Sequence, residues 1–273
     1  MTRYTRNTAT AWYPREATTA RRVCAGPSGP SGPPLIAVAH GSRDPRAAAT
    51  VEDLLDLVRR ARPELTVRTA YLDHASPTIA MALSGLSEAV VLPLLLTAAY
   101  HSRVDIPGAL AEVTARRPLH VHRGATLGPH PLMVDALERR LAEAGVEPGD
   151  PCTAVVLVSA GSSDRRANAT VAGIAGDCAR GRDWWSVTAA YASATGPTPA
   201  QEVRRLLGAG APRVVVAPYL LAPGHFADKV RADTLASGAD VVADVLGAAP
   251  ELATILVERY EQALRPAVQP ATA

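Results

Sequence analysis

Histidine and carboxylate side chains follow three successive apolar stretches in the first half of the chain. His40 follows LIAVA, Asp73 follows the stretch that ends in AYL, and His101 follows the long apolar run that begins near Ala89. Two imidazoles and a carboxylate suit a borderline divalent transition metal such as Fe²⁺, Co²⁺, Ni²⁺ or Zn²⁺ better than Mg²⁺. Neutral imidazole is also a base near physiological pH. These residues therefore predict metal chemistry, provided that the fold brings them together.

The segments around these residues alternate between short apolar runs and amphipathic stretches. Ser42 and Asp44 are natural N-cap residues, and Pro45 suits the first turn of a helix. We expect strands at 35–39, 66–72, 89–96 and 119–123, and helices from Pro45 and at 77–86, 105–116 and 131–144. This alternation predicts an α/β fold, a parallel flavodoxin-like sheet with helices on both faces. Strand ends meet at one edge of such a sheet, so His40, Asp73 and His101 are expected to converge there.

The chain then repeats itself. AHGSRDPRA at 39–47 returns as SAGSSDRRA at 159–167, and YLDHASPT at 71–78 returns as YASATGPT at 191–198, both displaced by 120 positions. LPLLLTAAYH at 92–101 matches APYLLAPGH at 217–225, and TLGPHP at 126–131 matches VLGAAP at 245–250. Matches in one order indicate an internal duplication. We predict two similar tandem domains, 35–147 and 148–265, joined near Gly145–Pro151.

The two copies differ at the candidate metal ligands. Ala160 and Ser193 stand where the first copy has His40 and Asp73, and only His225 matches His101. The second copy thus keeps the loops and loses most of the metal-capable side chains. We therefore place the active site in the first domain and interpret the second domain as degenerate.

The AHGS loop with its Pro-containing helix start, the YLDxAxP segment and the HSRVDIP segment resemble the class II chelatases of the CbiX and SirB type. These enzymes insert Co²⁺ or Fe²⁺ into sirohydrochlorin, and the resemblance runs from Leu35 to about Leu264, including the fused two-copy form. It implies that His40 and His101 bind the metal and accept pyrrole protons. Many members have Phe-Leu-Glu where this chain has Tyr71, Leu72 and Asp73, so the carboxylate is present on a shorter side chain.

The resemblance also implies the rest of the site. Sirohydrochlorin carries many carboxylates, so we expect Arg43 and Arg103, which flank the two histidine loops, to bind it together with Ser42. No cofactor is expected beyond the divalent metal substrate. Imidazole and carboxylate do not distinguish Fe²⁺, for sirohaem, from Co²⁺, for cobalamin. The alternative function is a carrier that binds a metal or a tetrapyrrole without turnover.

Composition limits the other classes of function. Among 273 residues, 48% are hydrophobic, yet the apolar runs are short and interrupted, so no membrane span is expected. Cys24, Cys152 and Cys178 form no CxxC pair, which favours a reducing, cytoplasmic location. Residues 1–34 contribute +4 to a net charge of +2, so the remainder is weakly acidic and no nucleic-acid binding is expected. We predict a flexible leader at 1–34, a flexible tail at 266–273, and a monomer or weak oligomer.

The remaining histidines and the tryptophan pair have plainer interpretations. We expect His74 to point away from Asp73 toward the surface. His120 and His122 lie two positions apart on one side of a predicted strand, a spacing that can hold a metal, but we interpret this remote pair as incidental. Trp184 and Trp185 are assigned to core or interdomain packing.

Overall fold

The computed structural model describes residues 32–98 and 101–265, and the side chains at positions 101 and 102 fall outside this description. The predicted leader and tail therefore lie outside the described residues, apart from residues 32–34. The carbonyl of Pro33 accepts a hydrogen bond from the Tyr260 hydroxyl at 2.8 Å, and the carbonyl of Pro34 accepts one from the Val90 amide at 2.9 Å. The last residues assigned to the leader thus join the fold.

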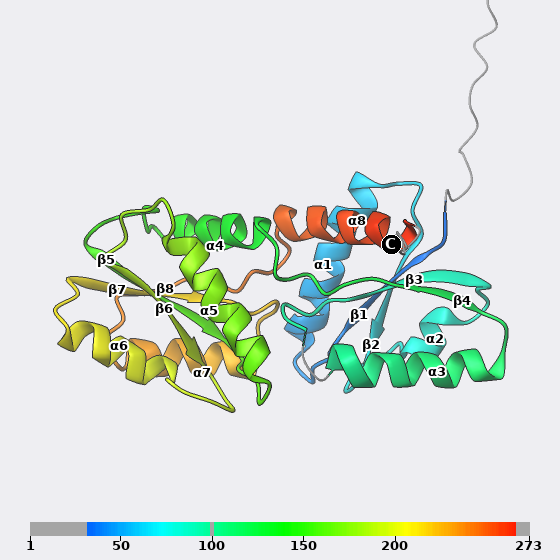
Figure 1. The fold of residues 1–273 in the computed structure, drawn as a ribbon, viewed down its shortest axis with the longest axis horizontal. Helices are drawn as coiled ribbons and strands as arrows, with labels where there is room; N and C mark the ends of the chain where they lie inside the picture. The colour runs from blue at the N-terminus through cyan, green and yellow to red at the C-terminus, as the bar shows by residue number, and fades with distance from the viewer. Residues whose placement is uncertain (1–31, 99–100, 266–273) are drawn as a thin grey trace, which may run out of the picture.

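The first half forms a four-stranded parallel sheet in the order β2-β1-β3-β4 (Figure 1). Its strands are β1 (Leu35–Ala39), β2 (Val67–Tyr71), β3 (Glu88–Pro93) and β4 (His120–Arg123), and its helical segments are α1 (Pro45–Ala61), α2 (Ile79–Leu83), the π-helical turn η1 (His101–Asp105), α3 (Ile106–Arg116) and α4 (Leu132–Glu143).

The second half repeats this plan in a sheet with the order β6-β5-β7-β8. Its strands are β5 (Thr153–Ser159), β6 (Ser186–Tyr191), β7 (Arg213–Pro218) and β8 (Val241–Val242), and its helices are α5 (Arg165–Ala179), α6 (Pro199–Gly208), α7 (His225–Leu235) and α8 (Pro250–Leu264). The predicted α/β fold with two parallel sheets is confirmed.

The first helix of each half begins in the same way. The Asp44 carboxylate accepts a hydrogen bond from the Arg46 amide at 2.9 Å, and the Asp164 carboxylate accepts one from the Arg166 amide, also at 2.9 Å. Each aspartate satisfies an amide that the helix cannot pair internally. The predicted apolar face of α1 is buried: Val51, Leu54, Leu55 and Val58. These caps fix where the loops that follow β1 and β5 end.

Two helices begin later than predicted. Helix α2 starts at Ile79 because the Thr78 side chain caps it, accepting a hydrogen bond from the Met81 amide. It ends before Gly85, whose φ of +77° lies in the left-handed region. Helix α3 starts at Ile106, after the wider turn η1 that begins at His101. The described residues that lead into these helices are thus loop before α2 and the π-helical turn η1 before α3.

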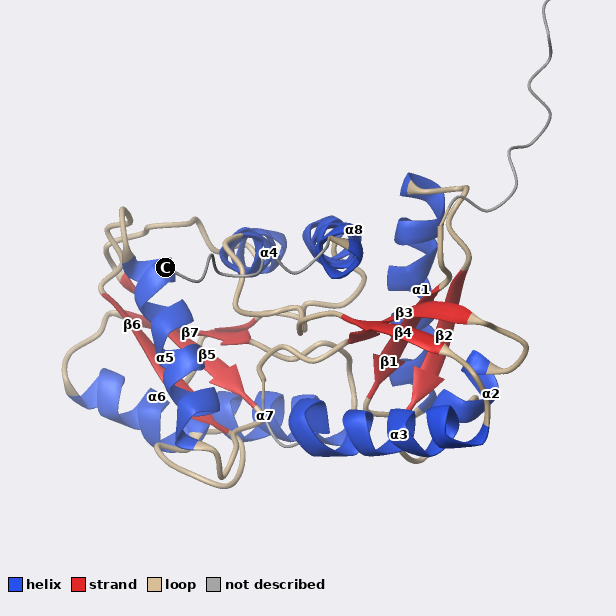
Figure 2. Ribbon diagram, turned by 45° about the vertical axis from the view of Figure 1, so that its right-hand side comes forward, coloured by secondary structure: helices blue, strands red, loops and turns tan. Residues whose placement is uncertain are grey.

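The last helix of each half packs on the opposite sheet. Helix α4 follows β4 along the chain but contacts α5 and β7, whereas α8 follows β8 and contacts α1, β3 and β4. Figure 1 shows α4 above the second sheet and α8 above the first, and Figure 2 shows the two helices side by side at the centre of the molecule. The boundary predicted between residues 147 and 148 remains a prediction. Helix α4 precedes this boundary in the chain but packs on the second sheet, and α8 follows it but packs on the first sheet.

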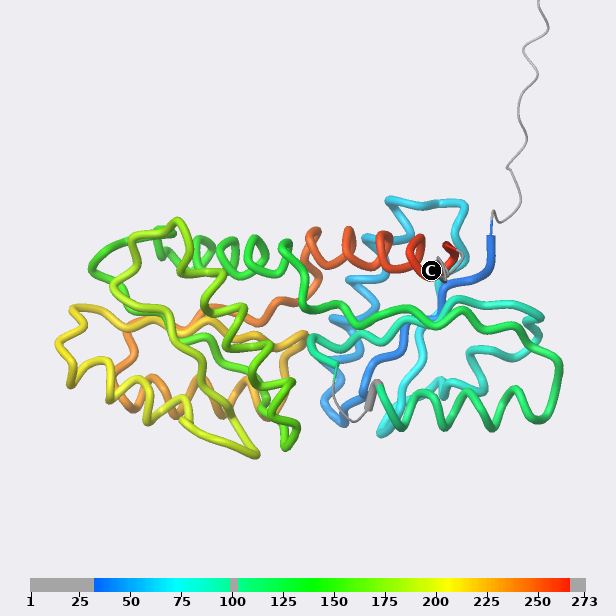
Figure 3. The backbone as a smooth tube through the Cα atoms, viewed as in Figure 1, coloured from blue at the N-terminus to red at the C-terminus, as the bar shows by residue number. Residues whose placement is uncertain are grey.

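Polar contacts hold α4 and α8, the exchanged helices, in place. Arg139 of α4 bonds to Glu251 of α8, and Arg62 after α1 bonds to Glu261 of α8 at 2.7 Å. The Arg140 guanidinium donates to the carbonyl of Leu246 at 2.8 Å. Figure 3 shows that the segment after β4 crosses from the first sheet to the second. The contacts of α4 therefore join the two halves. One hydrophobic core cluster accordingly contains residues of both sheets together with α4 and α8.

In the part of the chain that the structure describes, no helix combines the length and the apolar character needed to cross a membrane.

Candidate active site

The loops after β1 and β2 touch at their backbones. The Asp73 amide donates a hydrogen bond to the His40 carbonyl at 2.9 Å. Gly41 adopts a φ of +95°, and a Cβ at this position would lie 1.7 Å from the Asp73 carbonyl oxygen. Only glycine permits both this conformation and this approach. Gly41 therefore brings the His40 loop against the Asp73 loop, as predicted from the ends of adjacent strands.

The His40 side chain is exposed at this edge of the sheet, and its Nδ1 lies 3.3 Å from the Gly41 carbonyl oxygen. The Asp73 side chain is 63% exposed. Its carboxylate accepts a hydrogen bond from the His74 amide at 2.7 Å, and its second oxygen lies 3.3 Å from His74 Nε2. The expectation that His74 points away from Asp73 is wrong, because His74 has a φ of +59° and not an extended backbone.

His101 lies at the start of η1, in the connection between β3 and α3. Its backbone therefore follows the third strand, although its side chain lies outside the described residues. Two residues later, the Arg103 guanidinium pairs with the Asp164 carboxylate at 3.1 Å. Arg103 is thus at the predicted edge and is held by the residue that caps α5 in the second half.

Ser42 and Arg43 stand in the loop that leads into α1. The Ser42 hydroxyl accepts a hydrogen bond from the Asp44 amide at 3.0 Å, as Ser162 does for Asp164 at 3.1 Å. The Arg43 side chain is exposed. The hydrogen bond of Ser42 has the same form in both copies and so does not mark the first copy as the reactive one. The predicted substrate contacts of Ser42, Arg43 and Arg103 remain predictions.

An ion-pair network links this loop to the second half. Arg46 binds Asp44 and also binds Asp228 of α7, each at 2.6 Å. Hydrogen bonds from Arg46 lower the pKa of Asp44, and those from Asp44 and Asp228 raise the pKa of Arg46. The lowered pKa keeps the Asp44 carboxylate ionised, and available as a helix cap, to a lower pH than that of an isolated aspartate. Neither Asp164 nor Asp228 was anticipated, because their roles depend on contacts between the halves.

The carboxyl ends of the two sheets face each other. Tyr219 follows β7, and its buried hydroxyl donates to the carbonyl of Leu96, which follows β3, at 3.0 Å. The second copy reproduces the loop geometry without a histidine or an aspartate at these positions: Ser193 donates its amide to the Ala160 carbonyl, and Gly161 has a φ of +83°. The loop conformation consequently does not require the imidazole of His40.

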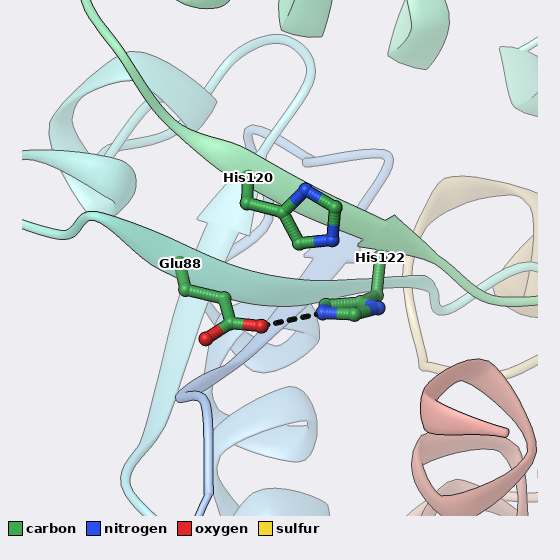
Figure 4. A group of neighbouring side chains, drawn as sticks. All are labelled: Glu88, His120 and His122. Atoms are coloured by element: carbon green, nitrogen blue, oxygen red, sulfur yellow. Dashed lines mark hydrogen bonds and ion pairs between the residues drawn. The ribbon is translucent and has the colours of Figure 1, made fainter. Parts of the chain in front are cut away.

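The other singled-out residues lie elsewhere. His225 is exposed at the start of α7, and Trp184 packs on the core against α4, as the packing interpretation predicted for this residue. His120 and His122 lie on β4 beside Glu88 of β3, and these three residues can together hold a metal (Figure 4). Glu88 was missed because the third strand was predicted to begin at Ala89. Only the register of β3 against β4 reveals the carboxylate.

Two parallel sheets whose carboxyl ends face one another, with His40 and Asp73 at the tip of the first sheet, define a two-lobed α/β protein. The sequence profile of the CbiX family matches this chain twice, at residues 34–144 and 154–263. The chain therefore belongs to the CbiX family, and the predicted resemblance is confirmed.

Individual relatives agree with this assignment. The chain is 29% identical to a sirohydrochlorin cobaltochelatase of Priestia megaterium over 84% of this chain and 79% of the relative. It is 28% identical to a sirohydrochlorin ferrochelatase of the same organism over 84% and 90%. The solved structure of SirB from Bacillus subtilis with Fe³⁺ has the same fold, with a TM-score of 0.75 and 24% identity over 85% of this chain and 96% of that one.

Proposed function

We propose that this chain is a sirohydrochlorin chelatase that inserts Fe²⁺ or Co²⁺ at the edge of the first sheet that carries His40 and Asp73, with His101 supplied from the start of η1. The observation that carries the proposal is the double CbiX match, together with relatives that are cobalto- and ferrochelatases of sirohydrochlorin. The metal and the tetrapyrrole are then both substrates. The first lobe supplies the reactive side chains, and the second lobe faces them.

The reaction requires the macrocycle to gain one metal ion and release two pyrrole protons. In the proposed site, His40 and His101 bind the incoming ion and accept protons, since imidazole performs both roles near neutral pH. Exposure of His40 supports this role, because a ligand that transfers its metal to a large flat substrate must be reachable from solvent.

Asp73 is the carboxylate of the proposed site. Its side chain is exposed, and its recorded partners are the amide and the ring of the adjacent His74. Rotation about its side-chain torsions is sufficient to release this local contact. We assign Asp73 to neutralising the charge of the arriving ion, and His74 to holding the carboxylate in the substrate-free protein.

Arg43, Arg103 and Ser42 are proposed to contact the peripheral carboxylates of the macrocycle. Arg103 already binds a carboxylate, that of Asp164, at 3.1 Å. A substrate carboxylate can replace Asp164 because both present the same planar pair of oxygens to the guanidinium. The Arg103–Asp164 pair is about half exposed on the arginine side, which permits this exchange.

The test is metal insertion into sirohydrochlorin under anaerobic conditions, followed by the change in the Soret band with Co²⁺ and separately with Fe²⁺. We expect turnover well above the uncatalysed rate. His40→Ala and His101→Ala should each remove most of it, whereas His225→Ala, the matched position in the second copy, should retain most. Equal loss in all three variants would refute an active site in one lobe.

The role of the Asp73 carboxylate is tested by comparing two substitutions. Asp73→Asn should slow insertion, and Asp73→Glu, which restores the longer side chain of many family members, should retain activity. Tight binding of sirohydrochlorin by the wild-type chain without turnover above background would instead identify a carrier.

A further inference from the structure

Glu88, His120 and His122 form a cluster at the amino-terminal edge of the first sheet, away from the proposed active site (Figure 4). Glu88 begins β3 and pairs in register with His120, the first residue of β4. His122 is two residues further along β4, so its side chain is on the same face of the strand as that of His120. The ligand atoms of all three residues lie within 4.8 Å of one another.

The local geometry already draws these side chains together. His122 Nε2 lies 2.7 Å from Glu88 Oε1, and the rings of His120 and His122 meet edge to face with centroids 4.5 Å apart. Ligands around one ion at about 2.0–2.2 Å would be separated by about 3.3 Å. The present separations need only small side-chain rotations to reach that value, and the backbone register can remain unchanged.

Accessibility and charge favour a cation at this point. Glu88 and His120 are exposed, and 46% of the Glu88 side chain is accessible. Among the described residues, the only ion pair recorded for Glu88 is with His122. The cluster thus offers one carboxylate oxygen and two imidazole nitrogens to an incoming cation, within reach of solvent.

The donor set selects the kind of ion. Two imidazole nitrogens and one carboxylate oxygen suit Zn²⁺, Co²⁺ or Ni²⁺, whereas Mg²⁺ and Ca²⁺ prefer oxygen ligands. Three protein ligands leave a position for water on the exposed side, because β4 is the edge strand of the sheet.

This cluster is distinct from the proposed insertion site. Glu88 lies two residues before Val90, which pairs with Leu35, and His40 lies five residues after Leu35. Seven residues of strand correspond to about 23 Å. No single ion can therefore contact both groups.

We propose that Glu88, His120 and His122 form a second site for a divalent transition metal, independent of the insertion chemistry. The bound ion bridges β3 and the edge strand β4, which is only four residues long. It therefore stabilises the first sheet at the end opposite the active edge. Because the same ions serve both sites, a chain loaded with Co²⁺ is expected to bind two ions, of which only the one at the active edge is transferred.

The experiment counts bound ions on the full chain without tetrapyrrole. Metal-free protein is titrated with Co²⁺ and with Zn²⁺, the bound metal is measured after equilibrium dialysis, and the melting temperature is recorded with and without Zn²⁺. We expect His120→Ala/His122→Ala to bind one ion fewer than wild type and to lose the metal-dependent rise in melting temperature. Metal insertion into sirohydrochlorin at saturating Co²⁺ should remain near the wild-type rate.

Two further variants keep the outcome interpretable. Glu88→Gln preserves the shape of the side chain and should weaken binding at this site by about 10-fold or more. His225→Ala removes an exposed histidine elsewhere and should change neither the number of ions nor the melting temperature. Unchanged stoichiometry and affinity in both His120→Ala/His122→Ala and Glu88→Gln would overturn the second site and leave the proposed chelatase activity unaffected.

Discussion

Replacing Gly41 with alanine is expected to separate the two loops that carry His40 and Asp73. The new Cβ would lie 1.7 Å from the Asp73 carbonyl oxygen, about 1.3 Å short of the 3.0 Å below which real Cβ contacts essentially do not occur. Because the obstacle is backbone, no side-chain rotation relieves it. The Asp73 loop must therefore move away from the His40 loop.

The cost has two parts. A non-glycine residue at a φ of +95° costs about 1 kcal/mol, and weakening the hydrogen bond from the Asp73 amide to the His40 carbonyl costs about 1 kcal/mol more. We expect the free energy of unfolding to fall by about 2 kcal/mol. A displacement of about 1 Å at reacting groups can reduce a rate by about 100-fold, so metal insertion should fall far more than stability alone explains.

Two glycines provide matched controls. Gly161→Ala places a Cβ 2.1 Å from the Ser193 carbonyl oxygen at the corresponding turn of the second copy, and Gly85→Ala introduces only the backbone strain because no atom lies within 4 Å. Urea unfolding and the initial rate of metal insertion are measured for all three. Gly41→Ala and Gly161→Ala should lose similar stability, but only Gly41→Ala should lose most of its activity. Equal rates for these two variants would refute the role assigned to the Gly41 turn.

Three further predictions concern single side chains. Burial raises the pKa of the Cys178 thiol to about 12, so in a Cys24→Ser/Cys152→Ser variant Cys178 should react with a thiol reagent at pH 8 only after unfolding. Hydrogen bonds from Arg205 hold the pKa of the nearly buried Glu202 carboxyl below 4.5. The ionised carboxylate therefore stabilises the folded state above pH 4.5, and this stabilisation is lost as the pH falls through the lowered pKa. Glu202→Gln should accordingly make the decline of the urea midpoint below pH 4.5 less steep. Tyr219→Phe removes the buried hydrogen bond to Leu96 and should reduce the free energy of unfolding by about 1 kcal/mol; no change in the urea midpoint would contradict this role.

Local patterns were sufficient to predict most of the first sheet. Its strands were recognised from apolar runs, and α1 from Asp44, Pro45 and an apolar face that the structure buries. The meeting of the His40 and Asp73 loops followed from the rule that parallel strands end at one edge. Each of these inferences depends on contacts within a strand–helix unit.

Contacts between segments that are distant in the sequence could not be predicted from such local patterns. The apolar face of α4 shows that it is buried but not on which sheet, because both sheets offer similar apolar surfaces. Asp164 pairs with Arg103 across 61 positions, and Glu88 meets His122 only through the register of β3 and β4. His74 was misplaced because a left-handed conformation at a non-glycine residue has no strong sequence signal.

The exchange of α4 and α8 makes the two lobes a single folding unit. A fragment that ends after α4 would leave the faces of β3 and β4 without α8, and a fragment that begins at β5 would leave β7 without α4. Both lobes are therefore expected to unfold in one cooperative transition. Because each half supplies a helix that covers the sheet of the other, the second lobe is needed for the fold of the first even though Ala160 and Ser193 stand where the first lobe has His40 and Asp73.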